Sequence, residues 1–423
     1  MPSASPVTDA SPQPVRRARW RLMAMALMVP TLGSSLGIDG GDLFQILAVE
    51  NLGLDARTIG IGLGFCTLSV PVQLWAARLT LGRARQRLVA FLVGDAVLCW
   101  ILALLVATAT PGSGLATSAL AVAVVAEIHL SVLYVTAWQP LLSQVLGAAD
   151  RQRNNAQGRA VARVLMAGLL LVFGLADETT RIVILVAIGG IALVLAKVVG
   201  GMPTPDPPVA VVDEPAEPAA APPGRRWSLP TGMWALCITA GLGAVSAWPL
   251  FVTYTHDVLW PDVNLGLMTA AQVGGQVTAG LLWRPTATGL MRRGRRAAVV
   301  SVVAATALAA IRAPVEGLTE GMLTLVTVAG AAAALTLVFL VVMELVHQTV
   351  DNDTSVRSMT IFDVVASTSG QTGLFVAGFL ISASVDSAWP VDPYRVYLLT
   401  AATLVAAAVL RLGRRRPALT TSG

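Results

Sequence analysis

Charged residues are scarce in this chain. Asp, Glu, Lys and Arg make up 13% of the 423 residues, whereas 55% are hydrophobic and the mean hydropathy is +0.72. In a water-soluble protein about a quarter of the residues are charged, so this chain has too little polar surface to cover a soluble globule. The composition therefore predicts a protein that is solvated by lipid.

Cysteine and histidine are also scarce, with three residues of each. Cys66, Cys99 and Cys237 lie in apolar runs without the spacing of a metal site. The sequence has no phosphate-binding loop and no set of residues typical of nucleophilic catalysis, so we expect no cofactor, no metal, no catalytic residues and no enzymatic activity. Lys197 is the one lysine, and the arginines form short clusters between apolar stretches, which does not favour a nucleic-acid partner.

Twelve stretches are candidates for membrane-spanning helices. A helix needs about 20 mostly apolar residues to cross roughly 30 Å of hydrocarbon. The first six stretches lie near residues 22–49, 58–77, 88–109, 116–146, 160–176 and 181–200. The other six lie near residues 229–255, 264–283, 297–312, 318–346, 360–382 and 395–411. The expected fold class is an all-α integral membrane protein with twelve transmembrane helices in two six-helix, pseudo-symmetric bundles.

The basic residues predict the orientation of these spans. When alternate loops are assigned to opposite sides, 25 of the 29 Lys and Arg residues fall on one side. The other side holds Arg57, Arg181, Arg312 and Arg395. Loops rich in Lys and Arg face the cytoplasm, so both termini are expected there, in a bacterial cytoplasmic (inner) membrane. No Lys or Arg is left for the middle of the membrane.

A polar segment divides the spans into two groups of six. Residues 201–224 contain eight prolines and four acidic residues, which rules out a span and predicts a solvated linker. The expected domains are a disordered tail (1–18), an N-terminal six-helix bundle (19–200), a cytoplasmic linker (201–226), a C-terminal six-helix bundle (227–412) and a basic tail (413–423).

The two halves resemble each other at a nearly constant offset. The Arg-Trp pair at residues 19–20 returns at 226–227, an offset of 207. Residues 58–60, which open the second span, correspond to residues 264–266, which open the eighth, and the basic cluster 83–87 corresponds to 292–296. These matches indicate a parallel internal repeat, with the halves related by an axis along the membrane normal.

The loops carry a more specific resemblance. Residues 290–296 and, less closely, 78–85 are similar to the Gly-x-x-x-Asp-Arg-x-Gly-Arg-Arg signature of the major facilitator superfamily, although both lack its Asp. The loop 150–159 after the fourth span is also similar to that family. The resemblance implies a transporter fold over the whole chain except the tail and the linker. The fourth span has no arginine and the fifth lacks a Gly-Pro pair, which argues against a standard drug–proton antiporter.

Carboxylates inside spans are candidates for proton coupling, because a charge at mid-span costs at least ~2.5–3.5 kcal/mol. Glu127 lies roughly 18 Å into the fourth span, near the midplane. Asp39 and Asp42 share one face of the first span, and Asp95 lies in the third. Burial favours the neutral form of a carboxyl, so we predict a coupling proton at Glu127, with the three aspartates as further candidates. Helix capping by Asp39 and Asp42, and a hydrogen bond from Asp95 to a neighbouring span, are the alternatives.

Polar and aromatic residues predict the wall of a central cavity. Four of them recur on one face of the fourth span, namely Glu127, Ser131, Tyr134 and Trp138. Other spans add Gln45, Trp248, Phe251, Tyr254, Gln272 and Gln276. For Trp248 and Tyr254, a position at the membrane interface is an equal alternative.

A gate is expected at the cytoplasmic ends of the spans. Its basic candidates are Arg83, Arg85, Arg87, Arg292, Arg295 and Arg296. Its acidic candidates are Glu344, near the end of the tenth span, and Asp363, at the start of the eleventh, where the helix dipole favours a carboxylate.

An acidic, aromatic cavity without Lys or Arg does not favour an anionic substrate, which needs a buried cation to offset its desolvation. We therefore predict a monomeric secondary transporter that works by alternating access in the lipid bilayer. Its expected activity is proton-coupled export of a hydrophobic or amphipathic, neutral-to-cationic small molecule or peptide-like product. Proton-coupled import of a neutral nutrient, and a non-transporting scaffold or sensor, are the alternatives.

Overall fold

The computed structural model of the protein describes residues 42–76, 83–133, 137, 164–202, 249–282, 290–311, 314–349, 355–385 and 392–412. These residues are mainly helical, and there is no strand among them. Each of the twelve predicted spans contains a described helix. The predicted all-α class is therefore confirmed.

The described helices of the N-terminal half begin with α3 (Asp42–Ile46), which continues into a π-helical turn, η1 (Leu47–Asn51). The second span combines α4 (Ala56–Gly64), the 3-10 segment η2 (Phe65–Leu68) and α5 (Ser69–Ala76). Then come α6 (Ala84–Thr108), α7 (Gly114–Leu133), the helix Val164–Leu175 and α10 (Glu178–Gly201).

The described helices of the C-terminal half follow the same plan. Its first span combines α12 (Pro249–Tyr254) with a π-helical turn, η6 (Thr255–Leu259). Then come α13 (Leu265–Leu282), α14 (Leu290–Ala309), α15 (Gly317–Thr349), α16 (Ser355–Val385) and α17 (Pro393–Leu412).

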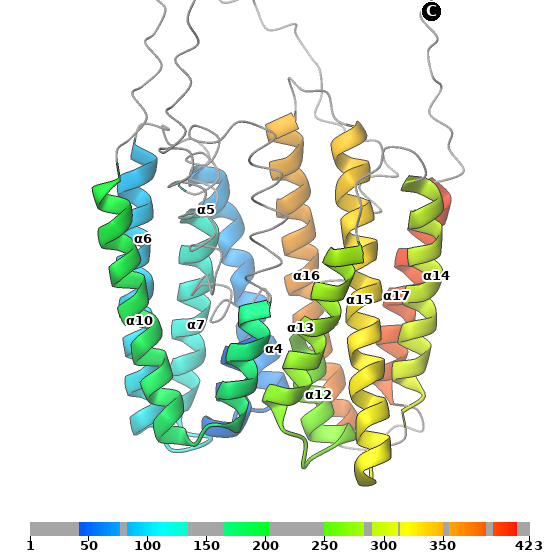
Figure 1. Ribbon diagram of the computed structural model, residues 1–423, viewed down its shortest axis with the longest axis horizontal. Helices are drawn as coiled ribbons and strands as arrows, with labels where there is room; N and C mark the ends of the chain where they lie inside the picture. Colours follow the sequence, from blue (N-terminus) through cyan, green and yellow to red (C-terminus); the bar gives the residue numbers. More distant parts are fainter. Residues whose placement is uncertain are drawn as a thin grey trace, which may run out of the picture.

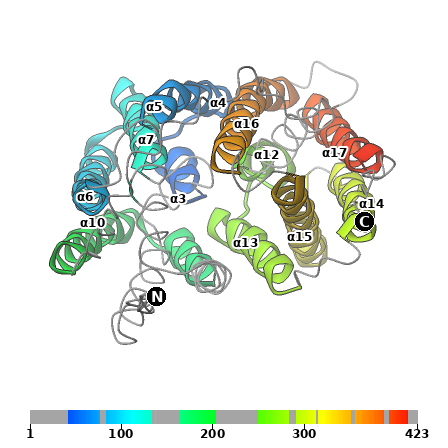
Figure 2. The same cartoon turned by 90° about the horizontal axis from the view of Figure 1, so that it is seen from above.

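The helices run side by side in two groups (Figure 1), and the view along them shows the N-terminal group beside the C-terminal group (Figure 2). In one group α6 packs between α7 and α10, and in the other α14 packs between α15 and α17. The groups meet where α4 packs on α16 and where α3 packs on α12 and α13. This arrangement brings the first span of each half to the centre of the molecule.

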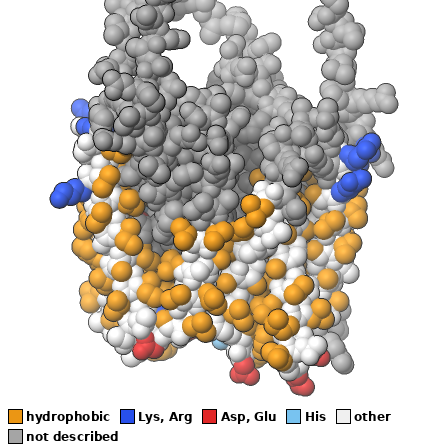
Figure 3. Space-filling view, viewed as in Figure 1, with side chains coloured by type: hydrophobic (Ala, Val, Ile, Leu, Met, Phe, Trp, Pro, Cys, Tyr) orange, Lys and Arg blue, Asp and Glu red, His pale blue; other side chains and the backbone are white. Residues whose placement is uncertain are grey.

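Apolar side chains cover the outside of the described helices (Figure 3). Large side chains such as Leu104, Leu175, Leu281, Val303 and Leu318 are more than 60% exposed. By length and composition, four described helices can cross a membrane, namely Ala84–Thr108, Glu178–Gly201, Gly317–Val338 and Pro393–Leu410. An apolar exterior of this kind belongs in lipid.

The two ends of the bundle differ in charge (Figure 3). We call one the basic end, because it carries Arg83, Arg85, Arg87, Lys197, Arg292, Arg295 and Arg296. We call the other the acidic end, because it carries Asp55, Asp177, Glu178, Asp257, Asp262, Glu316 and Glu320.

The second span changes its helical geometry where a proline requires it. Pro71 has no N–H, and its ring clashes with the carbonyl four residues earlier, at Thr67. The segment η2 (Phe65–Leu68), which contains Thr67, is a 3-10 helix, and the Thr67 hydroxyl donates to the Gly64 carbonyl at 2.8 Å. Local 3-10 geometry thus lets one continuous span accommodate the proline.

The ninth span begins earlier than expected. We predict a start at residue 297, with Arg292–Arg296 in the preceding loop, whereas α14 begins at Leu290 and includes these arginines. Arginine is a good helix former, and its long side chain can reach the membrane surface from a helix end. Gly294 also packs against α15, since a Cβ built there lies 2.9 Å from Val341 Cγ1. The helix therefore begins seven residues before the predicted span.

Candidate functional site

Two pairs of glycines at the acidic end bring the backbones of the two halves close together. A Cβ built on Gly60 of α4 lies 2.8 Å from the Cα of Gly378 on α16. A Cβ built on Gly266 of α13 lies 2.5 Å from the Cα of Gly174, on the helix Val164–Leu175. Cβ atoms essentially never come within 3.0 Å of a neighbour, so any side chain at these positions would push the two halves apart.

The internal repeat relates these two pairs. Gly60 and Gly266 are 206 residues apart, which is the offset between residues 58–60 and 264–266 in the sequence, and Gly174 and Gly378 are 204 apart. Each pair joins one span of the N-terminal half to one of the C-terminal half, so the same contact occurs twice about the pseudo-twofold axis. The repeat therefore marks the seam between the halves.

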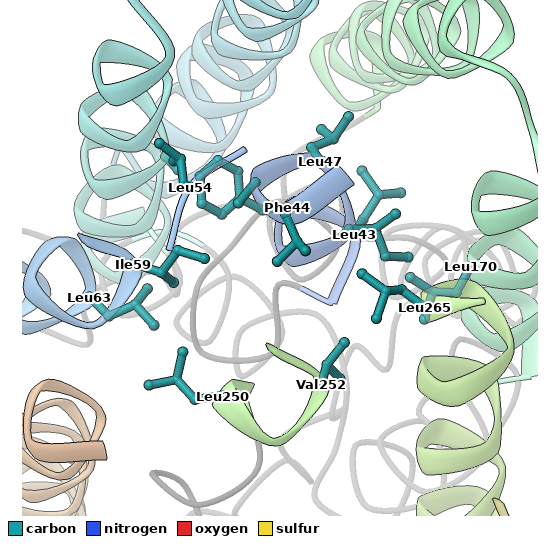
Figure 4. Packing of buried hydrophobic residues seen from close by; sticks show 14 of the residues in the cluster. Leu43, Phe44, Leu47, Leu54, Ile59, Leu63, Leu170, Leu250, Val252 and Leu265 are labelled. Atoms are coloured by element: carbon teal, nitrogen blue, oxygen red, sulfur yellow. The ribbon is translucent and has the colours of Figure 1, made fainter. Parts of the chain in front are cut away.

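Between the glycine pairs the halves meet through apolar side chains (Figure 4). We call these residues the apolar plug; they are Leu43, Phe44, Leu47, Leu170, Leu250, Val252 and Leu265. Each is at most 1% exposed. The plug contains residues from both halves, so it closes the seam near the acidic end.

The first span of each half widens into a π-helical turn at the acidic end. In η1 the amide of Leu52 donates to the carbonyl of Leu47 at 2.9 Å, and in η6 the amide of Trp260 donates to the carbonyl of Thr255 at 2.7 Å. Single π turns are frequent at functional sites. Each turn carries acidic residues, Glu50 in η1 and Asp257 in η6.

A buried arginine holds the acidic end of the N-terminal half together. Arg181, near the start of α10, pairs with Glu50, and its side chain is 8% exposed. Its guanidinium also donates to Asn51 Oδ1 at 2.8 Å and to the carbonyls of Phe173 and Gly174 at 3.0 and 3.2 Å. One side chain thus joins the end of the first span to the end of the fifth, beside the glycine pair.

Arg395 has the matching role in the C-terminal half. It donates to Asp392 Oδ2 at 3.1 Å, to the Tyr254 hydroxyl at 2.8 Å and to the carbonyls of Ala309 and Ile311 at 2.8 and 2.6 Å. Tyr254 itself donates to Asp392. Burial by itself raises the pKa of Asp392. The hydrogen bonds to Asp392 and the positive charge of Arg395 lower it by a larger amount, so the net pKa lies below its ordinary value.

We did not predict a functional role for Arg181 or Arg395; the sequence places them only among the few arginines outside the basic loops. One signal was present. An aspartate precedes the last span of each half. Arg181 follows Asp177 by four residues, and Arg395 follows Asp392 by three. An arginine in the first turn of a helix is unfavourable for the helix dipole, so its presence there indicated a tertiary partner.

His256 links the two halves electrostatically at the acidic end. Its Nδ1 lies 2.9 Å from Asp257 Oδ1. The pKa of His256 lies above its ordinary 6.5, mainly through this hydrogen bond; burial opposes the shift, and the charges of Asp257 and of Glu50 in the other half support it. The attraction between protonated His256 and Glu50 is the part of this shift that crosses the seam, so it favours the closed seam at low pH and is lost as the pH rises through the raised pKa.

We therefore expect the seam to open more often as the pH rises. The measurement is the labelling rate of Val252→Cys by a membrane-impermeant maleimide, in a chain whose native cysteines are replaced by alanine. The rate should increase from pH ~6 to pH ~8, relative to the exposed control Thr110→Cys. The same profile after His256→Gln would contradict the role of this histidine.

The structure describes one predicted proton-coupling side chain fully. Asp95 is the twelfth of the 25 residues of α6, it is 3% exposed, and its Oδ2 has no hydrogen-bond partner. On one side of it α6 packs on α7 through the stacked rings of Phe91 and His129, and on the other it packs on α10, where Trp100 donates to the Val186 carbonyl at 3.2 Å. For Glu127 and Asp42 only the backbone is described, in α7 and α3, and Asp39 lies outside the described residues.

The predicted cavity residues fall into three groups. Gln45 and Gln272 are buried, and their Oε1 atoms, like that of Gln276, have no partner. Phe251 and Tyr254 are also buried; their rings lie 6.0 Å apart, and the Tyr254 ring packs 4.6 Å from that of Tyr394 within the C-terminal half. The side chains outside the described part of the structure are Ser131, Tyr134, Trp138 and Trp248.

The predicted gate residues lie at the basic end where their side chains are described. Arg83, Arg292, Arg295 and Arg296 are exposed, and Arg87 is half-buried. Arg85 donates to the carbonyl of Met202 at 2.6 Å, which ties the start of α6 to the end of α10. For Glu344 in α15 and Asp363 in α16 only the backbone is described, so their pairing with these arginines stays a prediction.

Solved structures of transporters are similar to this chain over nearly its whole length. The nucleoside transporter NupG matches with a TM-score of 0.59 and 13% identity, covering 95% of this chain and 100% of that chain. A bacterial homologue of the lysosomal transporter Spinster, in an inward-facing and occupied conformation, matches with 0.58 and 13% identity, covering 94% of each chain. No protein-family model matches the sequence, and no curated protein matches it significantly.

A bacterial homologue of the iron transporter ferroportin allows two conformations to be compared. Its inward-facing state matches with a TM-score of 0.58 and 15% identity, covering 93% of this chain and 99% of that chain. Its outward-facing state matches with 0.53, also at 15% identity, covering 95% and 99%. The chain thus has the fold of these transporter structures, and its TM-score is higher for the inward-facing state than for the outward-facing one.

Proposed function

We propose that this protein is a secondary transporter that works by alternating access, as a monomer, in a bacterial inner membrane. Its two moving bodies are the bundles 19–200 and 227–412, joined by the linker 201–226. The excess of Arg and Lys at the basic end supports a cytoplasmic position for that end and for both termini. In this orientation the acidic end faces outward.

The seam at the acidic end is the observation that carries this proposal. Two repeat-related glycine pairs and the apolar plug join the halves there, with a hydrogen bond from Asn264 to the Gly174 carbonyl beside one of the pairs. Contacts that are small, apolar and symmetric can separate and re-form as the halves rock, because few hydrogen bonds between the halves must break. The closed seam corresponds to one of the two states that alternating access requires.

Proton coupling is proposed at the carboxylates within the bundle. Asp95 is the described candidate, because a buried carboxyl with an unpartnered oxygen has no cation to hold its charge. Glu127 remains the second candidate on the basis of its depth in the fourth span. A carboxyl that exchanges its proton as the cavity changes sides would link transport to the proton gradient.

The proposed cargo is a neutral-to-cationic small molecule or peptide-like product, moved outward in exchange for protons. Two observations support this class. The described Lys and Arg residues lie near the ends of the spans, so none offers a countercharge for a buried anion. NupG, with the same fold, transports nucleosides, which are uncharged. Import of a neutral nutrient would use the same cavity, but the solute and the proton would move in the same direction.

The test is flux into proteoliposomes under an imposed pH gradient, with ethidium as a cationic probe and uridine as a neutral one. We expect gradient-driven movement of at least one probe by the wild-type protein. Asp95→Asn should fold normally and reduce gradient-driven flux at least ~10-fold, which corresponds to about 1.4 kcal/mol of lost coupling, while exchange without a gradient continues.

Asp262→Asn is the matched control, because Asp262 is exposed at the acidic end and should not change coupling. If flux through both Asp95→Asn and Glu127→Gln keeps the pH dependence of the wild type, the proposal of proton coupling through these residues is contradicted. Absence of any protein-dependent flux of either probe would contradict transport of this cargo class.

A further inference from the structure

Several buried oxygen atoms near the seam have no hydrogen-bond partner. They belong to Gln45 of α3, Thr253 of α12, Gln272 and Gln276 of α13, and Gln371 of α16. Buried polar groups are almost always paired, because an unpaired one keeps the full cost of its desolvation. As the amides are oriented, the unpartnered end of each glutamine is its Oε1. The concentration of such groups on four neighbouring elements therefore calls for a physical reason.

The helical register turns these groups toward the seam. On α13 the residues Leu265, Thr269, Gln272 and Gln276 follow the i, i+4, i+7, i+11 pattern of one helix face. Leu265 at the start of this face belongs to the apolar plug (Figure 4). Two other sides of α13 pack on helices, since Gly266 meets the fifth span and Gly275 meets α15, and Leu267 and Leu281 are exposed on the outside. The two glutamines thus continue the plug face deeper into the molecule.

Gln371 has the corresponding position on α16. It lies seven residues from Gly378 and so shares the face that packs on α4 through Gly60. Gln371 is 2% exposed. Gln45 and Thr253 follow the plug residues Phe44 and Val252 directly in the chain, and α3 packs on both α12 and α13.

The five groups also lie at similar depths. Gln45 and Thr253 are each six residues from the acidic-end terminus of η1 or η6, which corresponds to about 9 Å. Gln272 and Gln276 are about 10 and 17 Å from the start of α13, and Gln371 is about 16 Å deep when measured through the Gly60–Gly378 contact. Gln45 and Thr253 thus lie level with the plug, whereas Gln276 and Gln371 extend beyond it on its inner side.

We infer that Gln45, Thr253, Gln272, Gln276 and Gln371 form a binding site for an uncharged solute that donates several hydrogen bonds. Unpartnered amide and hydroxyl oxygens accept bonds from O–H or N–H groups. The helices α12 and α13, which hold three of the five groups, carry no charged residue, so an ionic ligand would find no countercharge on them. The charged residues of the other two elements are Asp42 at the start of α3 and Arg357 and Asp363 in the part of α16 toward the basic end. The inference rests on the proposed transport function and narrows its neutral-to-cationic cargo to uncharged, donor-rich solutes.

The first test distinguishes whether these polar groups bind a ligand or stabilise the fold. The double variant Gln272→Met/Gln371→Met replaces two unpartnered amides with apolar side chains of similar length. If the amides are unpaired until a ligand binds, the ligand-free double variant in detergent should be more stable than the wild type, with a Tm higher by on the order of 2 °C or more. Asn264→Leu is the matched control, because the Asn264 amide donates to the Gly174 carbonyl and accepts from the Leu267 amide, each at 2.9 Å. Its Tm should fall.

The second test measures ligand class by thermal stabilisation of the full chain. Uridine and glucose are the uncharged probes, uridine 5′-monophosphate is the anionic one, and tetraphenylphosphonium is a cation without donors. We expect an uncharged probe to raise the Tm of the wild type and to lose this effect in Gln272→Met/Gln371→Met. The anion and the cation should leave the Tm unchanged.

Each outcome decides the inference. A lower Tm in the double variant, comparable to that of Asn264→Leu, would show that the amides support the fold and would overturn the site. Stabilisation by the anion or the cation alone, or by no probe, would overturn the ligand class. Failure of the proposed transport function would be a separate result. If the protein binds uridine but shows no gradient-driven flux, the site stands and the transport function is contradicted. If the protein shows flux but the double variant is destabilised, the transport function stands and the site is contradicted.

Discussion

Gly174→Val is expected to abolish alternating access by preventing closure of the acidic end. The Cβ at this position would meet the backbone of Gly266, which cannot move aside as a flexible side chain can. Because close-packed interiors transmit such overlap as displacement of whole elements, the two halves should separate along the seam. We expect transport to fall at least ~100-fold, equivalent to about 2.7 kcal/mol against the closed state.

Two measurements check this expectation. Flux in proteoliposomes reports transport, and maleimide labelling of Val252→Cys from the acidic side reports opening of the plug, which should label at least ~10-fold faster. The matched control is Gly168→Val on the same helix, because a Cβ built on Gly168 meets nothing within 4 Å. If Gly174→Val and Gly168→Val label and transport alike, the glycine pair does not govern closure.

Arg181→Met is expected to destabilise the N-terminal half by about 3–5 kcal/mol, the usual cost of removing one partner of a buried ion pair. The substitution leaves Glu50 without its cation, and it removes the hydrogen bonds from Arg181 to Asn51 and to the Phe173 and Gly174 carbonyls. The measurement is unfolding of the detergent-solubilised protein followed by circular dichroism.

Two further variants separate lost packing from uncompensated charge. Lys197→Met on the same helix removes an exposed cation and should leave stability within ~0.5 kcal/mol of the wild type. The double variant Arg181→Met/Glu50→Gln removes the unpaired carboxylate and should recover part of the loss. A loss in Arg181→Met no larger than that in Lys197→Met would show that the ion pair contributes little.

The sequence determined the position of nearly every helix, because membrane insertion depends on the summed transfer free energy of about 20 consecutive residues. That sum is local, so it can be read without knowing the neighbours of any residue. It failed at the start of α14, where Arg292 and Arg296 belong to the helix although they lower its mean hydropathy. The internal repeat could also be identified from the sequence without knowing any tertiary contact. It located Gly60 and Gly266 but did not reveal which residues they contact.

The candidate site shows where local information ends. Gln45, Gln272 and Gln276 were predicted from their polarity within apolar spans, whereas Thr253 and Gln371 were not, since hydroxyl and amide groups also occur in spans with partners close by. Only the packing of the helices distinguishes an unpartnered oxygen from a paired one.

The long-range contacts of Arg181 and Arg395 at the acidic end were decided by tertiary structure alone. Arg181 and Glu50 are 131 residues apart, and Tyr254 and Arg395 are 141 apart. A pattern within one helix fixes which residues share a face, but the rotation of that helix against its neighbours depends on the packing of many side chains at once. The sequence by itself therefore determined the spans, the two halves and their repeat. The tertiary structure decided the partners of each buried charge and the seam at which the halves close, because these depend on contacts between residues far apart in the chain.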